Sequence, residues 1–488
     1  MDHYHHSGSG WVIHTKIEMN YHGKKILILG MGNTGLSVAK WLSRTGAILS
    51  AADTRPSPPN LALFHQSMSA ENVFCGPFQA GMFLEIDLMV ISPGIPLGDP
   101  MVAAAVQRNI PVVGDIELFA LALREYDQGH AKIITITGSN GKSTVTTMVG
   151  MMAESAGWDV EVVGNIGRTV LDALMQRMDS NHWPQLWVLE LSSFQLETTR
   201  NLQADAAAVL NLSEDHLDRY TDMSAYIAAK SVIFSGSNCK GMQVINRDDP
   251  LVCAMTQVDR KQFSFGLGES ATDEEFGLLT DGADLWLAQG NTCLMKTSEL
   301  AVAGLHNAAN ALAALALCRS VALPFEPLLN ALRVFRGLPH RMQKVADINK
   351  ITFFNDSKST NVGATIAALN GLPTKAVLIA GGDGKGQDFL PLKHSVREHA
   401  RSVILLGRDA ESIAGSIQGC GIPVHRVATI QQAVQLSFLL AEPGDFVLLS
   451  PACASLDMFN NYVHRAEVFV DAVKAIENNF VPPTEVQH

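Results

Sequence analysis

Short runs of apolar residues recur along the chain, and most of them end at a glycine or a polar residue. The clearest runs occupy positions 24–30, 47–52, 86–91, 132–136, 186–190, 206–211, 375–380, 402–406 and 446–450. Unbroken apolar runs of this length are typical of parallel strands that are buried on both faces. Helical patterns separate the runs, and strands that alternate with helices indicate βαβ units. The pattern predicts an α/β fold.

Three such α/β units follow one another, with polar or turn-forming residues between them. A polar stretch at 124–129 precedes the second unit, and Gly337-Leu338-Pro339 precedes the third. We expect a Rossmann-like domain at 19–119, a P-loop-type central ATPase domain at 120–337 and a Rossmann-like C-terminal domain at 338–488. Residues 1–18 are rich in histidine, glycine and serine, which indicates an appended tag or leader outside the fold.

Composition narrows the class of protein. Of the 488 residues, 47% are hydrophobic, which is enough for several packed cores and excludes a wholly disordered chain. The 36 basic and 48 acidic residues give a net charge of −12, so neither nucleic acid nor an anionic membrane is an expected partner. The seven cysteines include no CxxC pair, which predicts no disulfide framework and no zinc site and suits a reduced, cytosolic compartment. The longest charge-free stretch, 300–318, contains polar residues and predicts a buried helix without membrane insertion.

A glycine-rich fingerprint follows the first apolar run. It reads Gly30-Met31-Gly32-Asn33-Thr34-Gly35, and Asp53 ends the next run. Glycines at this point let the backbone approach a pyrophosphate at a helix N-terminus, and the carboxylate accepts hydrogen bonds from a nucleoside. Taken alone, the fingerprint predicts NAD or FAD about as well as any other nucleotide-like ligand. A tight turn without a ligand is the remaining interpretation.

A second glycine-rich loop joins the run at 132–136 to a helical pattern. It reads Thr137-Gly138-Ser139-Asn140-Gly141-Lys142-Ser143-Thr144. Backbone N–H groups in such a loop cradle phosphates, Lys142 neutralises the β- and γ-phosphate oxygens, and Ser143 binds Mg²⁺. Ile136 stands where the full P-loop pattern has glycine, so this is the shortened variant GxxGKS. The loop predicts an ATP site.

If this loop binds ATP, other polar residues become candidates for the same site. Glu190 ends an apolar run, where a carboxylate is a natural Mg²⁺ ligand, and His216 lies in a polar segment farther along. The spacing of Lys230 alone favours a helix lysine whose head reaches solvent. Polar, glycine-rich strand ends at 355–361, 381–386 and 450–455 indicate a surface for an anionic ligand. Cys453 is expected to pack in a core and not to act as a nucleophile.

Several of these segments together resemble the Mur ligases of bacterial cell-wall synthesis, and most closely the members that add D-glutamate. The similar stretch extends from about Gly23 to Phe480. The motifs that carry the resemblance are the loop at 137–144, Glu-Leu-Ser-Ser-Phe-Gln-Leu at 190–196, Glu-Asp-His-Leu-Asp-Arg-Tyr at 214–220, Gly-Leu-Pro-His-Arg-Met at 337–342, Asn-Asp-Ser-Lys-Ser-Thr-Asn at 355–361 and Ser-Pro-Ala-Cys-Ala-Ser-Leu-Asp at 450–457.

The resemblance implies a reaction and two substrates. An ATP-dependent ligase would join D-glutamate to UDP-N-acetylmuramoyl-L-alanine through an acyl phosphate and a tetrahedral intermediate, as a cytoplasmic monomer that makes peptidoglycan precursor. The fingerprint of the first domain would then receive UDP and not a nicotinamide cofactor. The residues implied to bind the UDP substrate are Gly32, Thr34, Gly35, Asp53, Thr54, Arg55, Gly94 and Asn165.

The other site residues follow from the same resemblance. ATP would be bound by Gly138, Ser139, Asn140, Gly141, Lys142, Ser143, Thr144, Asn310, Arg341 and Asp356. Two Mg²⁺ ions would be held by Ser143, Glu190, His216 and Lys230, the last as a carbamylated lysine. D-glutamate would be bound by Lys358, Thr360, Lys385, Ser455 and Tyr462, where another member of the family has phenylalanine at the last position. Lys142, His216 and Lys230 are the implied catalytic residues.

Three other functions remain open at this point. Another amino-acid ligase of the Mur or folylpolyglutamate synthase type would share the same loops. A nicotinamide-dependent oxidoreductase would use the first domain but would leave the loop at 138–143 without a role. A catalytically inactive nucleotide-binding scaffold would bind ATP without turnover.

Overall fold

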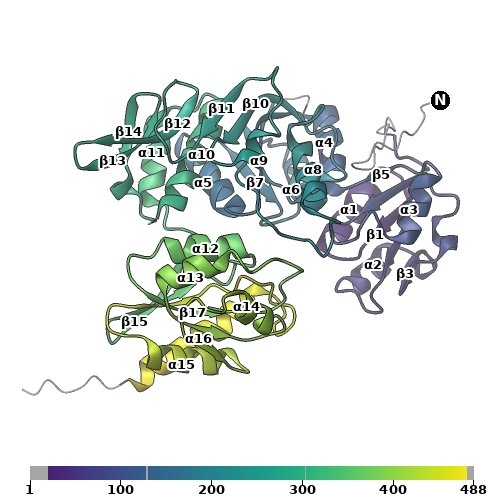
Figure 1. Cartoon of the computed structure of the whole chain (residues 1–488). Coiled ribbons are helices and arrows are strands. Elements are labelled where there is room, and N and C mark those ends of the chain that lie inside the picture. The colour runs from purple at the N-terminus through teal and green to yellow at the C-terminus, as the bar shows by residue number, and fades with distance from the viewer. Residues whose placement is uncertain (1–19, 128–129, 303, 481–488) are drawn as a thin grey trace, which may run out of the picture. The chain divides into compact units, whose positions relative to one another are not determined.

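The computed structural model describes residues 20–127, 130–302 and 304–480, whose strands form three separate sheets (Figure 1). Contacts between residues divide the chain into two compact units. The first two sheets belong to one unit and the third sheet to the other. The first unit contains the residues up to Leu212 with Ser224–Lys296 and Asn310–Leu332, and the second contains Ser213–Met223, Thr297–Ala309 and the residues from Arg333 onward. The leader expected at 1–18 lies outside the described residues.

The first sheet consists of five parallel strands. Its domain contains β1 (Lys25–Leu29), α1 (Asn33–Ser43), β2 (Ile48–Asp53), α2 (Leu61–Ser67), β3 (Val73–Cys75), β4 (Leu88–Ile91), α3 (Pro100–Gln107), β5 (Val112–Val113) and α4 (Asp115–Tyr126). The strand order β3-β2-β1-β4-β5 reverses between β1 and β4. Ligands of such sheets bind beyond the carboxyl ends of the strands at this reversal. The fingerprint at 30–35 and the Ser92-Pro93-Gly94 turn follow these two strands, and the Ser92 hydroxyl donates to the Gly30 carbonyl at 3.3 Å.

The second sheet has nine strands in the order β14-β13-β12-β11-β10-β9-β6-β8-β7. They are β6 (Lys132–Thr137), β7 (Val160–Gly164), β8 (Leu186–Glu190), β9 (Ala204–Val209), β10 (Cys239–Asn246), β11 (Gln262–Phe265), β12 (Glu275–Asp281), β13 (Asp284–Gln289) and β14 (Thr292–Lys296). The neighbouring pairs from β7 through to β12 are parallel, whereas β13 and β14 are antiparallel to their neighbours. This antiparallel edge is absent from the βαβ pattern expected from the sequence. Gly282 and Gly290, with φ of 63° and 53°, form the tight turns that join its strands.

Helices accompany the second sheet, and one of them corresponds to the charge-free stretch at 300–318. The helices are α5 (Lys142–Ser155), α6 (Val170–Ser180), α7 (Ser193–Leu196), α8 (Met223–Ser231), α9 (Pro250–Cys253), α10 (Leu305–Ser320) and α11 (Phe325–Val334). The residues from Ala311 to Cys318 in α10 are completely buried, as expected for a core helix. Among the residues described, none of the helices has both the length and the apolar character that crossing a bilayer requires.

The first two sheets are connected through α1 and α6. Thr169, which precedes α6 and caps its N-terminus, donates a hydrogen bond to the hydroxyl of Ser37 at 2.8 Å. The guanidinium of Arg44 forms two hydrogen bonds with the carboxylate of Asp179, at 2.7 and 2.8 Å. These contacts join the domain of the fingerprint to the domain of the phosphate loop.

The third sheet has six strands in the order β15-β16-β20-β17-β18-β19, of which only the first is antiparallel to its neighbour. Its domain contains β15 (Gln343–Ile348), β16 (Ile351–Asn355), α12 (Val362–Asn370), β17 (Ala376–Ala380), α13 (Leu392–His399), β18 (Ala400–Leu405), α14 (Ala410–Ser416), β19 (Val424–Arg426), α15 (Ile430–Leu440), β20 (Phe446–Leu449) and α16 (Tyr462–Asn479).

Alternate residues of β17 explain why this strand is apolar throughout. Leu378 and Ala380 pack in a core with residues of α12, α13 and α14, whereas Val377 and Ile379 pack in another core with residues of α15 and α16. The helices therefore cover both faces of the sheet, as Figure 1 shows for α12 and α13 on one side and α15 and α16 on the other. A strand with two buried faces has no polar alternation. Cys453 is fully buried in the first of these cores, where burial raises the pKa of its thiol to about 12, as expected for a packing residue.

One buried carboxylate in the first unit yields a prediction about stability. Asp115, at the start of α4, is 3% exposed, and its Oδ1 has no hydrogen-bond partner. Burial raises the pKa of Asp115 to about 6, against opposing hydrogen bonds from backbone N–H groups and from Gln195. Because the folded state holds this proton more tightly than the unfolded state, the contribution of Asp115 to stability falls as pH rises from about 4 to above 6.

We therefore expect Asp115→Asn to raise the free energy of unfolding at pH 8, by about 1 to 3 kcal/mol, and to give little or no gain near pH 4. Denaturant unfolding at both pH values measures the difference. Asp179→Asn, which removes an exposed carboxylate paired with Arg44, is the control and should not stabilise the protein at pH 8. An equal effect of Asp115→Asn at the two pH values would contradict the prediction.

Candidate active site

The loop Gly138–Ser143 follows β6, and its last two residues are the first two of α5. Gly141 directly precedes α5 and has a φ of 81°, in the left-handed region that favours glycine. A Cβ at this position would lie 2.7 Å from the side-chain oxygen of Asn310. Asn310, predicted to bind ATP, therefore lies next to the loop predicted to bind the phosphates.

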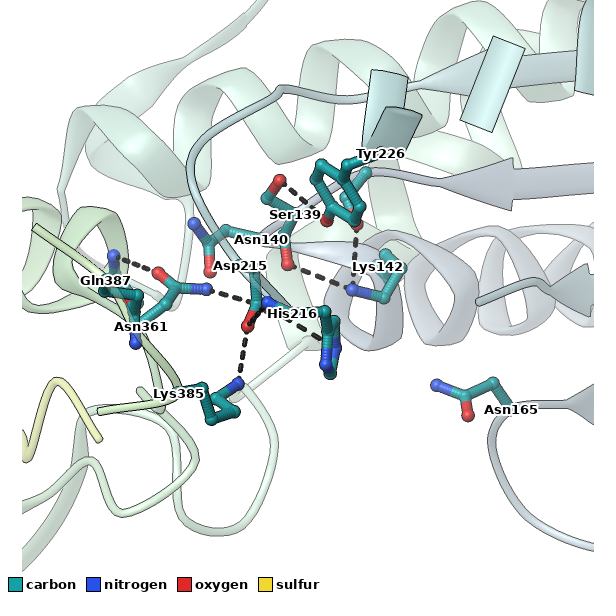
Figure 2. Close-up of polar contacts among 12 residues, drawn as sticks. Ser139, Asn140, Lys142, Asn165, Asp215, His216, Tyr226, Asn361, Lys385 and Gln387 are labelled. Carbon is teal, nitrogen blue, oxygen red and sulfur yellow. Dashed lines mark hydrogen bonds and ion pairs between the residues drawn. The ribbon is translucent and has the colours of Figure 1, made fainter. Parts of the chain in front are cut away.

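Several side chains hold this loop in shape (Figure 2). The Asn140 N–H donates to Oδ1 of Asn211 at 2.8 Å, and Nδ2 of Asn211 donates to the Asn140 carbonyl at 3.1 Å. The hydroxyls of Ser139 and Tyr226 are 3.0 Å apart. The Lys142 amine donates to the carbonyl oxygens of two loop residues, Gly138 and Ser139, at 2.9 Å each. The amine is thus held against the loop itself.

Glu190 lies at the carboxyl end of β8, beside the start of the loop that follows β7. Its carboxylate is 1% exposed, and Oε1 accepts a hydrogen bond from the Asn165 side chain at 2.8 Å. The other oxygen, Oε2, is buried and has no hydrogen-bond partner among the described residues. Gly164 makes this approach of β7 to β8 possible, because a Cβ there would lie 2.3 Å from the Glu190 carbonyl oxygen. A buried carboxylate oxygen without a donor is an arrangement that suits a cation.

Lys230, in α8, is almost completely buried, at 2% exposure. Its amine donates to the Thr137 hydroxyl at 3.2 Å and to the Gly138 carbonyl at 3.0 Å. It also lies 4.9 Å from the centre of the Tyr226 ring. The interpretation that spacing alone favours, a lysine with its head in solvent, is therefore wrong. The amine points instead to the end of β6, where the phosphate loop begins.

His216 belongs to the second unit, within the segment Ser213–Met223. Its neighbour Asp215 forms an ion pair with the Lys385 amine at 2.5 Å, and both side chains are nearly buried. The Asn361 amide donates to the other carboxylate oxygen of Asp215 at 3.4 Å. His216 has a φ of 58°, and its Nε2 is 3.7 Å from that same oxygen. Figure 2 shows Asp215 between Lys385 and Asn361.

The predicted metal ligands are divided between the units. Ser143, Glu190 and Lys230 belong to the first unit and His216 to the second. Among the described residues, no three His, Cys, Asp or Glu side chains are gathered as they would be around a metal ion. The predicted set differs from such a group because it includes a serine hydroxyl and a modified lysine.

Asp356 is the centre of a buried network in the second unit. Its Oδ2 accepts hydrogen bonds from the hydroxyls of Ser359 (2.6 Å) and Ser450 (2.8 Å), and its Oδ1 accepts one from the Met342 N–H (3.2 Å). Burial raises the pKa of Asp356 to about 6, while these hydrogen bonds and the charge of Arg341 oppose the rise. Asp356 thereby ties the loop after β16 to the loop after β20 and to the segment that carries Arg341. The predicted ATP ligands Arg341 and Asp356 are neighbours.

The residues predicted to bind D-glutamate also belong to the second unit. Lys358 and Thr360 alternate with Ser357, Ser359 and Asn361, whose side chains are buried and hold the loop after β16. Lys385 lies in the loop after β17, Ser455 in the loop after β20, and Tyr462 begins α16. The Lys358 amine is 5.5 Å from the centre of the Tyr462 ring. All five residues therefore lie at carboxyl ends of strands of one sheet or at the N-terminus of the helix that follows.

In the first domain, the Asp53 carboxylate accepts several hydrogen bonds from nearby residues. Its buried carboxylate accepts from the Met31 N–H (2.7 Å), the Arg55 N–H (2.9 Å) and two guanidinium nitrogens of Arg55 (2.8 and 2.7 Å). Burial raises the pKa of Asp53, but these hydrogen bonds prevail and lower it to about 2. Asp53 thus fixes both the fingerprint loop and Arg55, while Thr54, Arg55 and Gly94 remain exposed. Gly35 admits no side chain, because a Cβ would lie 1.8 Å from the Gly30 carbonyl oxygen.

Three residues that shape the site were not singled out from the sequence. Asn211 and Tyr226 brace the phosphate loop, and Asp215 pairs with Lys385. Asn211 and Asp215 stand in the polar segment around His216, so their position was a usable signal. Tyr226 stands one helical turn before Lys230, a spacing that places both on one face of α8.

Comparison with known proteins defines the class. Residues 24–114 match the "Mur ligase MurD-like, N-terminal domain", residues 136–318 the "Mur ligase middle domain" and residues 340–453 the "Mur ligase, glutamate ligase domain". The chain therefore belongs to the Mur ligase family and is an ATP-dependent amino-acid ligase. Its fold is accordingly the expected three-domain α/β arrangement. The match of the first domain also removes the support for a nicotinamide-dependent oxidoreductase.

Individual relatives narrow the class further. The chain is 64% identical to a UDP-N-acetylmuramoylalanine--D-glutamate ligase of Nitrosomonas europaea, over 96% of this chain and 100% of the relative. It is 63% identical to the enzyme of the same name from Nitrosomonas eutropha, over the same shares. Among solved structures, MurF from Acinetobacter baumannii is similar in fold, with a TM-score of 0.59 and 18% identity over 93% of this chain and 92% of that one.

Proposed function

We propose that the chain joins D-glutamate to UDP-N-acetylmuramoyl-L-alanine and that ATP is converted to ADP and phosphate in the process. The observation that carries the proposal is the loop Gly138–Ser143, with Lys142 held against it. The chain that contains it is 64% identical, over 96% of its residues, to a UDP-N-acetylmuramoylalanine--D-glutamate ligase. The acidic amino acid suits the third domain, where Lys358 and Lys385 lie at the carboxyl ends of two strands.

The chemistry starts from a carboxylate, which is a poor acyl donor. The alanyl carboxylate attacks the γ-phosphorus of ATP, an O–P bond forms, and the bond to ADP breaks to leave an acyl phosphate. The neutral amine of D-glutamate then attacks the acyl carbon, and the tetrahedral intermediate expels phosphate while the nitrogen loses a proton. Lys142 holds its positive charge at the loop where phosphoryl transfer would occur, so it stabilises charge that develops on the oxygens.

The residues present fit divalent cations. Among the residues that the structure describes, none donates a hydrogen bond to the buried Oε2 of Glu190, so Glu190 with Ser143 would hold one Mg²⁺. His216 and a carbamylated Lys230 would hold a second. When bound, Mg²⁺ offsets negative charge on phosphate and carboxylate oxygens. Asn165, which donates to Glu190, orients that carboxylate as a ligand.

Carbamylation of Lys230 changes the sign of its charge. A neutral Lys230 amine adds to CO₂, an N–C bond forms, and one proton leaves, so the product is a carboxylate-like group. The burial of the amine next to Thr137 and Gly138 supports this proposal, because an ammonium is costly there and an anion next to a cation is not.

The remaining parts of the proposal concern substrates and location. The UDP group would lie at the reversal of the first sheet, by Gly32, Thr34, Gly35 and Gly94, with Asp53 holding Arg55 in place. The protein would act as a monomer in the cytoplasm, where the nucleotide substrates are made.

Phosphate release tests the proposed reaction. The protein is mixed with ATP, Mg²⁺ and UDP-N-acetylmuramoyl-L-alanine, and a panel of amino acids is added one at a time. Release should require D-glutamate and the UDP substrate together. If phosphate is released only with a different amino acid, the protein is still an amino-acid ligase but the D-glutamate assignment is wrong. Binding of ATP without release under any condition would support an inactive scaffold.

A further inference from the structure

One fully buried arginine in the second unit lies beneath the loops assigned to the amino acid. Arg465, in α16, is 2% exposed. Its Nε donates to the Ser357 hydroxyl at 3.0 Å and its Nη2 to the Ser357 carbonyl at 2.8 Å. Its Nη1 donates to the carbonyl oxygens of Cys453 and Ala454, at 3.1 and 3.4 Å. One guanidinium thus joins two loops that are about a hundred residues apart in the sequence.

Both loops carry residues of the predicted D-glutamate site. Ser357 directly precedes Lys358, and Ala454 directly precedes Ser455. The Ser357 hydroxyl also donates to the carbonyl of Tyr462 at 2.8 Å, which fixes the first residue of α16 against the same loop. The contacts of Arg465 and Ser357 therefore fix the backbone at or next to three of the predicted ligands, Lys358, Ser455 and Tyr462.

The partners of Arg465 are uncharged. Within the part of the chain that the structure describes, its hydrogen bonds go to one hydroxyl and to three carbonyl oxygens, and none goes to a carboxylate. Burial lowers the pKa of Arg465, while the charges of Asp457 and Asp356 act in the opposite direction without a hydrogen bond to it. A buried cation without a bonded counter-ion is expensive for a protein to maintain. Neutral side chains could join the loops at lower cost, so the charge itself calls for a reason.

We infer that Arg465 is a positioning residue for the amino-acid site and that its buried charge favours an amino acid with two carboxylates. Its planar fork sets the distance between the loop of Lys358 and Thr360 and the loop of Ser455. Its charge adds to that of Lys358 in the same loop, whereas the charge of Lys385 is paired with Asp215. The inference rests on the proposed function, because it takes these residues to be the ones that bind D-glutamate.

Two substitutions separate geometry from charge. Arg465→Lys keeps the charge but loses the fork, and Arg465→Met loses both. We expect the KM for D-glutamate to rise about tenfold in the first variant and at least about a hundredfold in the second. The KM for UDP-N-acetylmuramoyl-L-alanine should stay within about twofold in both, because its UDP group is proposed to bind at the first domain. The KM for ATP is no control here, because the predicted ATP ligand Asp356 directly precedes Ser357. A role in folding alone would instead lower thermal stability and change the KM for the UDP substrate together with the KM for D-glutamate.

A third variant covers the case in which Arg465→Met does not fold. Ser357→Ala removes the hydroxyl that accepts from Nε and donates to Tyr462, while the backbone contacts of Arg465 remain. It should raise the KM for D-glutamate several-fold with little change in melting temperature. The matched control is Arg426→Gln, an exposed arginine of the same unit paired with Glu411, which should leave all three KM values unchanged.

The outcomes distinguish the inference from the function on which it rests. If the unsubstituted protein uses D-glutamate but folded Arg465→Lys and Ser357→Ala variants show an unchanged KM for it, the inference is wrong and the proposed function stands. If the unsubstituted protein does not use D-glutamate at all, the proposed function fails first.

Discussion

Lys142→Met should lower ATP-dependent phosphate release by roughly a thousandfold or more while the protein remains folded. The methionine side chain has nearly the same length but carries no charge and donates no hydrogen bond. In the structure the Lys142 amine donates to two loop carbonyls, so the substitution removes two ordinary hydrogen bonds from the fold. Phosphoryl transfer loses the cation closest to the loop that would hold the phosphates. Lys142→Met should therefore lower kcat far more than it lowers the stability of the protein.

The matched control for this variant is at the other end of the same strand. Lys132 begins β6, is half exposed, and pairs with Asp205 at 3.1 Å. Exposed ion pairs contribute about 0 to 1 kcal/mol, so Lys132→Met should leave kcat unchanged and stability nearly so. Steady-state phosphate release and thermal unfolding of both variants measure the contrast. A near-normal kcat in folded Lys142→Met would show that Lys142 has no part in phosphoryl transfer and would contradict the prediction.

Lys230→Ala should also be nearly inactive, by about a thousandfold, and short carboxylates such as acetate should restore part of its activity. The substitution leaves a space beside Thr137 and Gly138, which an added carboxylate of similar size would fill. A carbamate is itself a carboxylate on a lysine, so the added anion supplies the lost oxygens. Restoration should follow the concentration of the anion and should not occur with an amine such as ethylamine.

The control for this rescue is Lys240→Ala, which removes an exposed lysine of the same unit and should keep full activity with or without acetate. Rescue of Lys230→Ala by the amine but not by acetate would show that the ammonium is the working form. Full activity of Lys230→Ala without any addition would refute a catalytic role altogether.

Much of the fold follows from the sequence because parallel strands buried on both faces leave an apolar signature. The runs at 24–30, 132–136, 186–190 and 375–380 correspond to β1, β6, β8 and β17 within a residue or two. The antiparallel edge of the second sheet does not follow, because β12 to β14 are partly exposed and mixed in polarity. In the sequence this edge is indicated only by the glycines of its two turns, Gly282 and Gly290, and a pattern of alternating strands and helices does not include such turns.

The site was predictable where chemistry is local and not where it depends on packing. The predicted phosphate loop consists of eight consecutive residues, so its pattern alone is enough to predict an ATP site. The burial of Lys230 could not be predicted in this way, because it depends on Tyr226 and on the end of β6. The sequence pattern of its own helix indicates neither contact. The pair of Asp215 with Lys385 joins residues 170 positions apart, and no periodicity reports such a contact.

The interleaving of the two units limits how the polypeptide can be divided. The unit of the third sheet is assembled from three stretches, and one of them, Ser213–Met223, comes from the middle of the chain. A fragment that began at Arg333 would contain the whole third sheet but would lack Asp215. Its Lys385 ammonium would then lose the carboxylate with which it pairs at 2.5 Å, at a cost in stability. Excision of this domain at a single boundary would therefore remove part of what folds it.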